Sequence, residues 1–265
     1  MLVKSSLKRV TQTFLLLTTV QQIMNFTAAS AAGAPKVNAN RQTGTIQIDP
    51  PEGVAIKGSM ILLHGLGDSS SGWADFAYQM ATDIPGMRFV LPTAPSIPVT
   101  LNNGFVMPAW YDIKSLSEDG NRECDHLDET KDFIVTLLEK ERSKIPKDSK
   151  LFLGGFSQGG AVSLYTGLQL PETAPLIDGV LCMSGYLPES EKFNLADRCK
   201  GIPVSMHHGT ADQVVRMSWA ELSKKHLEDA GLENTIEWHT YPNMPHSACM
   251  EELKHVVTWI KKLLG

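Results

Sequence analysis

The sequence predicts an α/β fold in which a mostly parallel, twisted sheet carries helices on both of its faces. Three observations indicate this class. Short runs of residues recur that are continuously apolar instead of alternating with polar residues, which is typical of strands buried on both faces. Segments with apolar residues at helical spacing lie between several of these runs. No internal repeat or linker interrupts the alternation, so the pattern predicts one layered domain.

The predicted strands are short apolar runs that begin after residue 58. They comprise residues 59–63, 88–92, 150–154, 179–184, 203–208 and 235–241. Each has the length that is usual for a strand inside a sheet.

The predicted helices follow or separate these strands. Their apolar positions are, in order, Phe133, Ile134, Leu137 and Leu138 in 125–141; the run 161–165; Leu222 and Leu227 in 218–230; and Leu253, Val256, Val257, Ile260 and Leu264 in and just after 247–263. These positions recur at the intervals of a helix with one apolar face. We therefore expect the helices to cover the sheet.

The composition is that of a globular protein with a sizeable core. The chain has 265 residues, of which 42% are hydrophobic, and a formal net charge of −5. Lysine and arginine are not clustered, so we expect no nucleic-acid partner. The four cysteines, Cys124, Cys182, Cys199 and Cys249, form no C-x-x-C pair, which excludes a zinc ribbon or a thioredoxin-type motif. Free and mostly buried thiols are expected.

The first 48 residues differ from the rest because they contain no acidic residue. Basic residues precede the apolar stretch 14–17, and an alanine-rich run follows at 28–34. Three interpretations stay open: a signal peptide, an organellar transit peptide, or a disordered extension with no targeting role on a cytosolic enzyme. No stretch reaches the ~20 apolar residues that span a bilayer. We divide the chain into an N-terminal extension, 1–44, and a single domain, 45–265.

The strongest chemical motif is Gly155-Phe156-Ser157-Gln158-Gly159, which follows the strand 150–154 and opens the next helix. It is the G-x-S-x-G pattern in the strand–turn–helix setting of a nucleophilic serine. The helix that begins at Gln158 directs free N–H groups at the site and favours a developing oxyanion. A solvated serine in a glycine-rich turn is the alternative, and the strand and helix on either side argue against it.

A serine needs a base to become a nucleophile, and in this arrangement the chain order is serine, acid, histidine. Asp212 follows the strand that ends at His208, and His246 follows the strand that ends at Tyr241. Both therefore lie on loops after strands. The sequence predicts a catalytic triad of Ser157, Asp212 and His246.

The second donor of the oxyanion hole is expected on the loop after an early strand. His64-Gly65-Leu66-Gly67-Asp68 occupies that place, and its glycines let the backbone approach a substrate closely. We expect the backbone N–H groups of Leu66 and Gln158 to form the oxyanion hole.

These motifs together resemble the acyl-protein thioesterase/carboxylesterase family of α/β-hydrolases, also named the phospholipase/carboxylesterase family. The matching tracts, in the family's order, are residues 64–68, 98–102, 107–112, 155–160, 208–212 and 245–247. The resemblance implies the α/β-hydrolase fold and removal of palmitoyl groups from protein cysteines through an acyl-serine intermediate. A general carboxylesterase or lysophospholipase is the enzymatic alternative, and an inactive lipid-binding module is the alternative outside the enzymes.

The resemblance also implies an apolar acyl channel, to which Val99, Leu101, Met107 and Trp110 map; by position alone these residues could equally belong to the core. S-acylated proteins or acyl lipids are the implied partners, with room for a transient contact with a membrane surface. No metal and no organic cofactor is expected. The family implies a cytoplasmic location, which a targeting peptide within 1–34 would override.

Two departures from the family pattern put the acyl-chain preference in doubt. Tyr111 replaces the Phe expected after Trp110, and Ser184-Gly185-Tyr186 stands where a Trp is common.

Overall fold

The computed structural model describes residues 33–115, 123–232 and 234–265. Most of the N-terminal extension, residues 1–32, lies outside this range, and so do the targeting interpretations that rest on it. Among the described residues, no helix is both long and apolar enough to cross a membrane.

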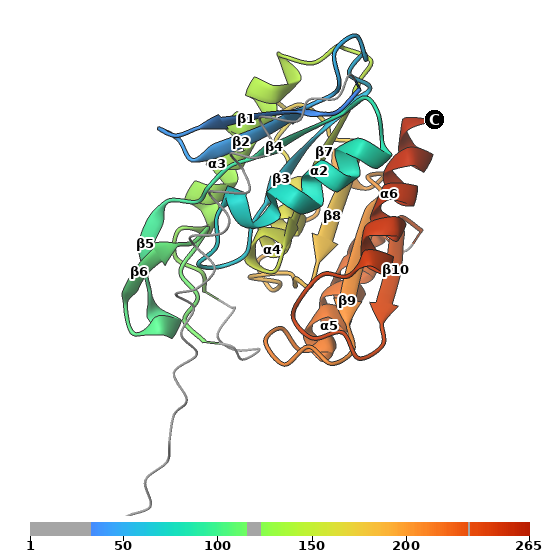
Figure 1. The fold of residues 1–265 in the computed structure, drawn as a ribbon. Helices are drawn as coiled ribbons and strands as arrows, with labels where there is room; N and C mark the ends of the chain where they lie inside the picture. The colour runs from blue at the N-terminus through green and yellow to red at the C-terminus, as the bar shows by residue number, and fades with distance from the viewer. Residues whose placement is uncertain (1–32, 116–122, 233) are drawn as a thin grey trace, which may run out of the picture.

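One eight-stranded sheet organises the chain, in the strand order β1-β2-β4-β3-β7-β8-β9-β10 (Figure 1). Its strands are β1 (Lys36–Asn40), β2 (Thr45–Asp49), β3 (Gly58–Leu63), β4 (Met87–Leu91), β7 (Lys150–Phe156), β8 (Gly179–Met183), β9 (Val204–Gly209) and β10 (Ile236–Tyr241). Within this sheet the six neighbouring strands β4, β3, β7, β8, β9 and β10 are all parallel, whereas β1 and β2 are antiparallel to their neighbours. The six predicted strands are all present, and the mostly parallel sheet is confirmed.

Helices cover both faces of this sheet. They are α2 (Ala74–Asp83), α3 (Leu127–Arg142), α4 (Gln158–Gly167), α5 (Met217–Leu227) and α6 (Met250–Leu264), with short 3₁₀ turns η1 (Ser70–Trp73), η2 (Thr100–Asn102) and η4 (Asp197–Cys199) and a π turn η5 (Glu228–Leu232). The helices α2 and α6 pack on one face, and α3, α4 and α5 pack on the other (Figure 1).

The central strand β3 shows how the sheet serves two cores. Met60 and Leu62 are buried with α2 and α6, whereas Ile61 and Leu63 are buried with α3 and α4. Successive side chains of a strand point to opposite faces, so an uninterrupted apolar run is what a doubly covered strand requires.

Several elements were not predicted from the sequence pattern. The helix α2 buries mainly alanine and methionine. The hairpin of β5 (Ser96–Val99) and β6 (Phe105–Pro108) has four of its eight strand residues exposed. The strand β1 lies upstream of Thr45, where the predicted domain begins, and it pairs along its whole length with β2. Its side chains are nearly all exposed, so no apolar pattern marks it.

Two residues of the predicted apolar helix faces lie outside the core. Phe133 on α3 is 43% exposed and Leu222 on α5 is 42% exposed, while their neighbours Ile134 and Leu227 are buried. The helices pack over a narrower stripe than the apolar pattern suggests. The four cysteines are free as predicted, and three of them are buried.

Candidate active site

Ser157 occupies a sharp turn between β7 and α4. Its backbone angles are φ 53° and ψ −118°, a conformation that residues other than glycine rarely adopt. The Ser157 N–H donates a 2.8 Å hydrogen bond to the Met183 carbonyl of β8, and the Ala161 N–H donates to the Ser157 carbonyl at 2.9 Å. These bonds from the neighbouring strand and helix hold the serine in its strained conformation.

The two glycines of the motif are required by close approaches of the backbone. A Cβ atom on Gly155 would lie 2.4 Å from the Gly159 carbonyl carbon, and one on Gly159 would lie 2.3 Å from the Leu63 carbonyl oxygen. Both distances are far below van der Waals contact. Hydrogen is therefore the only side chain that fits between β3, β7 and α4.

His246 bridges the serine and the aspartate. Its Nε2 lies 2.9 Å from the Ser157 Oγ, and its Nδ1 lies 2.7 Å from the Asp212 Oδ2. A carboxylate only accepts, so Nδ1 carries the proton and Nε2 is free to accept from the serine hydroxyl. The structure thus brings together all three residues of the predicted triad, from loops after β7, β9 and β10.

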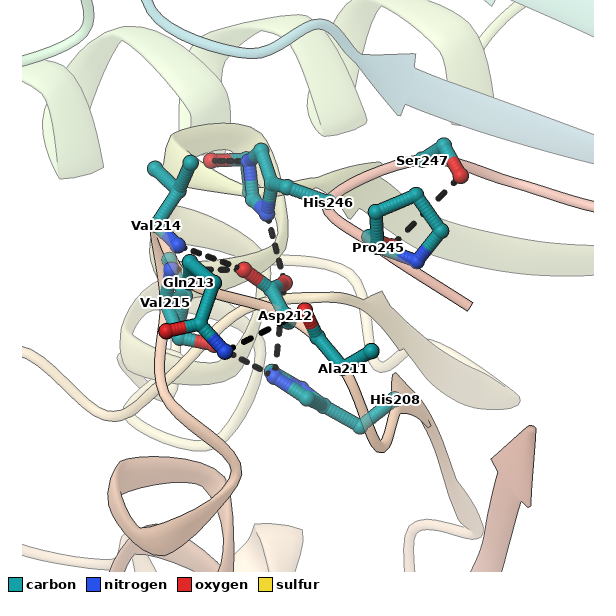
Figure 2. Close-up of polar contacts among 10 residues, drawn as sticks. His208, Ala211, Asp212, Gln213, Val214, Val215, Pro245, His246 and Ser247 are labelled. Carbon is teal, nitrogen blue, oxygen red and sulfur yellow. Dashed lines mark hydrogen bonds and ion pairs between the residues drawn. The ribbon is translucent and has the colours of Figure 1, made fainter. Parts of the chain in front are cut away.

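Asp212 is held by its own turn as well as by His246. Its Oδ1 accepts hydrogen bonds from the N–H groups of Val214 at 2.8 Å and Val215 at 2.9 Å (Figure 2). Burial alone raises the pKa of this carboxyl, but the bond and charge of His246 and the two backbone donors outweigh it. The net result is a pKa below the usual value, so Asp212 is ionised and oriented.

His208 also touches the aspartate but cannot take the place of His246. Its Nε2 donates to the Val215 carbonyl at 2.8 Å and lies 3.6 Å from the Asp212 Oδ2 (Figure 2). Burial lowers the pKa of the His208 imidazole. A neutral His208 ring whose Nε2–H donates to the Val215 carbonyl supports the Asp212 turn, and of the two histidines it is His246 that contacts the serine.

The loop after β3 lies against the serine, as an oxyanion hole requires. A Cβ atom on Gly65 would lie 3.4 Å from the Ser157 Cβ. Within the described part of the chain, the N–H groups of Leu66 and Gln158 donate to no carbonyl or side chain. Two free donors beside a nucleophile are the arrangement that stabilises a tetrahedral oxyanion.

A polar network that the sequence pattern did not reveal fixes this loop. The Ala94 N–H donates to the His64 Nε2, which places the ring proton on Nδ1, bonded to the Gly65 carbonyl at 2.7 Å. The Trp110 indole N–H donates to the His64 carbonyl at 2.8 Å. Nothing in the sequence indicated this contact, because the tracts 64–68 and 107–112 are far apart along the chain.

The Gln158 side chain forms the second part of the network. Its Oε1 accepts from the Trp110 N–H at 2.9 Å and its Nε2 donates to the Tyr111 carbonyl at 2.7 Å. Both side-chain groups are satisfied in the core. The residue that offers its backbone N–H at the site is therefore anchored through its side chain.

The residues assigned to the acyl channel divide into two pairs. Leu101 and Met107 are half-buried on the β5–β6 hairpin, whose Pro108 carbonyl accepts the Gly67 N–H at 2.8 Å. Val99 and Trp110 are fully buried in the core. The hairpin thus lies beside the oxyanion loop, and contact of these residues with an acyl chain stays a prediction.

The two departures from the family pattern meet in space. The hydroxyl groups of Tyr111 and Tyr186 lie 2.6 Å apart and are hydrogen-bonded within the core. Burial raises the pKa of both phenols, so both keep their protons. Each tyrosine supplies the partner that the other needs.

Among the described residues, no three His, Cys, Asp or Glu side chains are grouped so as to hold a metal ion.

Comparisons with known proteins agree with this geometry. The model of the phospholipase/carboxylesterase family matches residues 48–264. The chain is 42% identical over 209 residues to acyl-protein thioesterase 1 homolog 1 of Dictyostelium discoideum, covering 78% of this chain and 90% of the relative. It is 39% identical over 236 residues to acyl-protein thioesterase 1 of Mycosarcoma maydis, covering 83% and 97%. The crystal structure of Zea mays acyl-protein thioesterase 2 superposes with a TM-score of 0.72 at 29% identity, covering 83% and 99%. The chain therefore belongs to the phospholipase/carboxylesterase family.

Proposed function

We propose that this protein removes palmitoyl groups from protein cysteines, with Ser157, His246 and Asp212 as its catalytic triad. It is a serine hydrolase, and its relatives named acyl-protein thioesterase extend over most of the chain. One observation carries the site assignment: the unbroken hydrogen-bond chain of 2.9 Å from Ser157 to His246 and 2.7 Å from His246 to Asp212.

The cycle consists of two acyl transfers. The Ser157 oxygen attacks the thioester carbonyl carbon while His246 takes the hydroxyl proton. Asp212 stabilises the imidazolium that results. The backbone N–H groups of Leu66 and Gln158 bind the oxyanion, and loss of one such donor costs about 2.7–4 kcal/mol of transition-state stabilisation.

Collapse of the first tetrahedral intermediate breaks the carbon–sulfur bond. His246 gives its proton to the departing cysteine thiolate, which leaves as a thiol. Water then attacks the acyl-serine while His246 takes a proton from it. The second collapse returns that proton to Ser157 and releases the fatty acid, so the enzyme is regenerated.

A general carboxylesterase or lysophospholipase would use the same triad on small acyl esters. The two functions differ in the substrate that the enzyme prefers, and the inactive lipid-binding module differs from both in having no turnover. The buried, oriented state of Asp212 supports an active enzyme, since a binding module has no need of it.

The test compares a palmitoylated cysteine peptide with the matched serine peptide, in which an oxyester replaces the thioester. We expect the full chain to favour the thioester by kcat/KM, and Ser157→Ala to lower turnover by about 10⁶-fold. A fluorophosphonate should label the wild-type chain but not the variant. Preference for lysophospholipid over both peptides would support the alternative enzyme, and labelling that persists in Ser157→Ala would overturn the nucleophile.

The β5–β6 hairpin supports a transient contact with a membrane surface, where S-acylated proteins reside. Phe105 is 68% exposed and Val106 is 57% exposed at its end, beside the half-buried Met107. Exposed apolar residues next to the predicted acyl channel suit an interface between water and lipid. Phe105→Ser should slow hydrolysis of a vesicle-bound thioester and leave a water-soluble thioester unaffected; equal loss on both substrates would contradict the contact.

A further inference from the structure

A trough of about 840 Å³ lies between the β1–β2 hairpin and one side of α3, and none of the triad residues lines it. Its apolar part is formed by Val90, Ile97, Ala109, Trp110, Phe133 and Leu137. This is the size and character of a site for a small apolar ligand. It also accounts for Phe133, which the apolar pattern of α3 placed on the packing face but which is 43% exposed.

The trough follows from the way in which the sheet ends. On β2, Ile46 and Ile48 point into the core formed with α2. Thr45 and Gln47 point to the opposite face, where they line the trough. The antiparallel hairpin therefore extends one core and leaves the other face of β2 open toward α3.

One end of the trough carries positive charge. Lys140 and Lys144 line it there, and among the described residues neither ammonium group forms an ion pair. The acidic residue beside them, Glu141, is already compensated by Arg88 at 2.7 Å and by a 2.6 Å hydrogen bond from Ser59. The carboxylate Glu129 lies toward the other end of α3.

The distances suit an extended amphiphile with one anionic end. The rise of 1.5 Å per residue sets Phe133 and Lys140 about 10 Å apart along the axis of α3, and Lys144 follows just beyond the end of this helix at Arg142. An apolar chain along Phe133 and Leu137 would place an anionic group within reach of the two lysines, whose long side chains extend readily to it.

We propose that this trough is a binding site for a long-chain fatty acid anion, separate from the catalytic site. The ligand rests on the proposed function only in that a fatty acid is the product of acyl hydrolysis. The positive charge at the lysine end favours an acyl carboxylate over a neutral lipid. The apolar wall favours an acyl chain over a polar chain.

Trp110 joins the trough to the catalytic site. This residue lines the trough, while its indole N–H donates to the His64 carbonyl and its backbone N–H donates to the Gln158 side chain. A ligand in the trough therefore packs against the residue that positions both halves of the oxyanion hole.

The experiment is photolabelling of the full chain carrying Ser157→Ala with a palmitic acid analogue that bears a diazirine in mid-chain. We expect adducts on peptides that contain Phe133 or Ile97. In the same background Phe133→Asp should weaken this labelling by about tenfold or more, whereas Leu222→Asp, an equally exposed leucine on α5, should not change it. Lys144→Glu should raise the concentration needed for labelling several-fold, and Lys147→Glu, which does not line the trough, is its matched control.

Adducts confined to segments around Ser157, or labelling of α3 that survives Phe133→Asp, would overturn the proposal. Absence of any adduct on α3 would overturn it as well. Because the probe is a free fatty acid and the labelling needs no turnover, the outcome is independent of whether the wild-type enzyme prefers thioesters. Circular dichroism of each variant checks that the fold is retained.

Discussion

Ser157 shows how a single position can combine strain with function. A residue other than glycine in such a backbone conformation costs about 1–3 kcal/mol, and hydrogen bonds from β8 and α4 hold it there. The strained conformation directs the Ser157 hydroxyl at His246, so it serves catalysis at a cost in stability. The two flanking glycines make the turn sterically feasible.

The substitution Gly159→Ala should therefore damage the protein severely. Its Cβ would lie 2.3 Å from the Leu63 carbonyl oxygen, and the backbone of β3 cannot yield without disturbing the oxyanion loop. We expect a loss of roughly 2–4 kcal/mol in the free energy of unfolding, measured by urea denaturation. Gly201→Ala, where a Cβ would meet nothing within 4 Å, should leave stability unchanged; comparable losses would show that the clash is not the cause.

The two histidines beside Asp212 should differ sharply in their effect on turnover. His246→Ala removes the base and should lower kcat by about 10⁴-fold or more. His208→Ala removes the bond to the Val215 carbonyl and only loosens the Asp212 turn, so we expect a loss of at most about a hundredfold. Steady-state kinetics on a soluble thioester distinguishes them, and equal damage from both would reopen the choice of base.

At the scale of the element, α6 carries an unusual first turn directly after the His246 loop. Glu252 is fully buried there, and within the described chain its Oε1 has no hydrogen-bond partner. Its Oε2 accepts from the Cys249 N–H at 3.4 Å, and the Cys249 Sγ accepts from the Glu252 N–H, which caps the helix. Burial raises the pKa of Glu252 from 4.5 to about 8, although the Cys249 bond opposes it.

This raised pKa makes the stability of the protein depend on pH. The folded state holds the Glu252 proton more tightly than the unfolded state. The stability that the protonated Glu252 contributes is therefore complete below pH 4.5 and is lost as the pH rises toward 8. Glu252→Gln stays neutral throughout, and its free energy of unfolding relative to wild type should increase by on the order of 3 kcal/mol between pH 5 and pH 8. Urea denaturation at several pH values measures this difference. Glu251→Gln, in the same turn but exposed, should show no such trend; a flat difference for Glu252→Gln would contradict the raised pKa.

At the scale of the whole molecule, β1 decides where the folded domain begins. It pairs with β2 from Lys36 opposite Asp49 to Asn40 opposite Thr45 and covers an edge that would otherwise present unpaired N–H and C=O groups. A chain that starts at Gly33 should keep the melting temperature and activity of the full chain. A chain that starts at Thr45 should melt roughly 5 °C lower but retain the triad and turnover. Identical melting of the two, by calorimetry, would show that β1 adds nothing to the domain.

The same boundary bears on the N-terminal extension. If the segment up to about residue 34 is a cleavable targeting peptide, mass spectrometry of the protein from its native cell should find a new N-terminus between Ala31 and Pro35. Removal there would leave β1 intact, since this strand begins at Lys36. Recovery of the uncleaved chain would contradict the targeting interpretations and leave the hydrolase assignment unaffected.

The sequence by itself determined what depends on neighbours along the chain. The six apolar runs predicted the parallel strands because burial on both faces leaves no polar alternation. Gly155, Ser157 and Gly159 identified the nucleophile turn because its steric demands are local. The chain order identified Asp212 and His246. By contrast, β1 was missed because its side chains are nearly all exposed and carry no apolar pattern. The β5–β6 hairpin was missed although its residues are largely apolar, because strands of four residues are too short to show a period.

Only the tertiary structure decided what depends on residues that are distant in sequence. It set the neighbours of β3, it paired Tyr111 with Tyr186, and it tied Trp110 to His64. It also left Phe133 at an open trough, although the helical spacing alone placed it with Ile134 in the packed face. The physical reason is that periodicity shows which face of a helix is apolar, whereas the surface available to cover that face is set by where the other elements end.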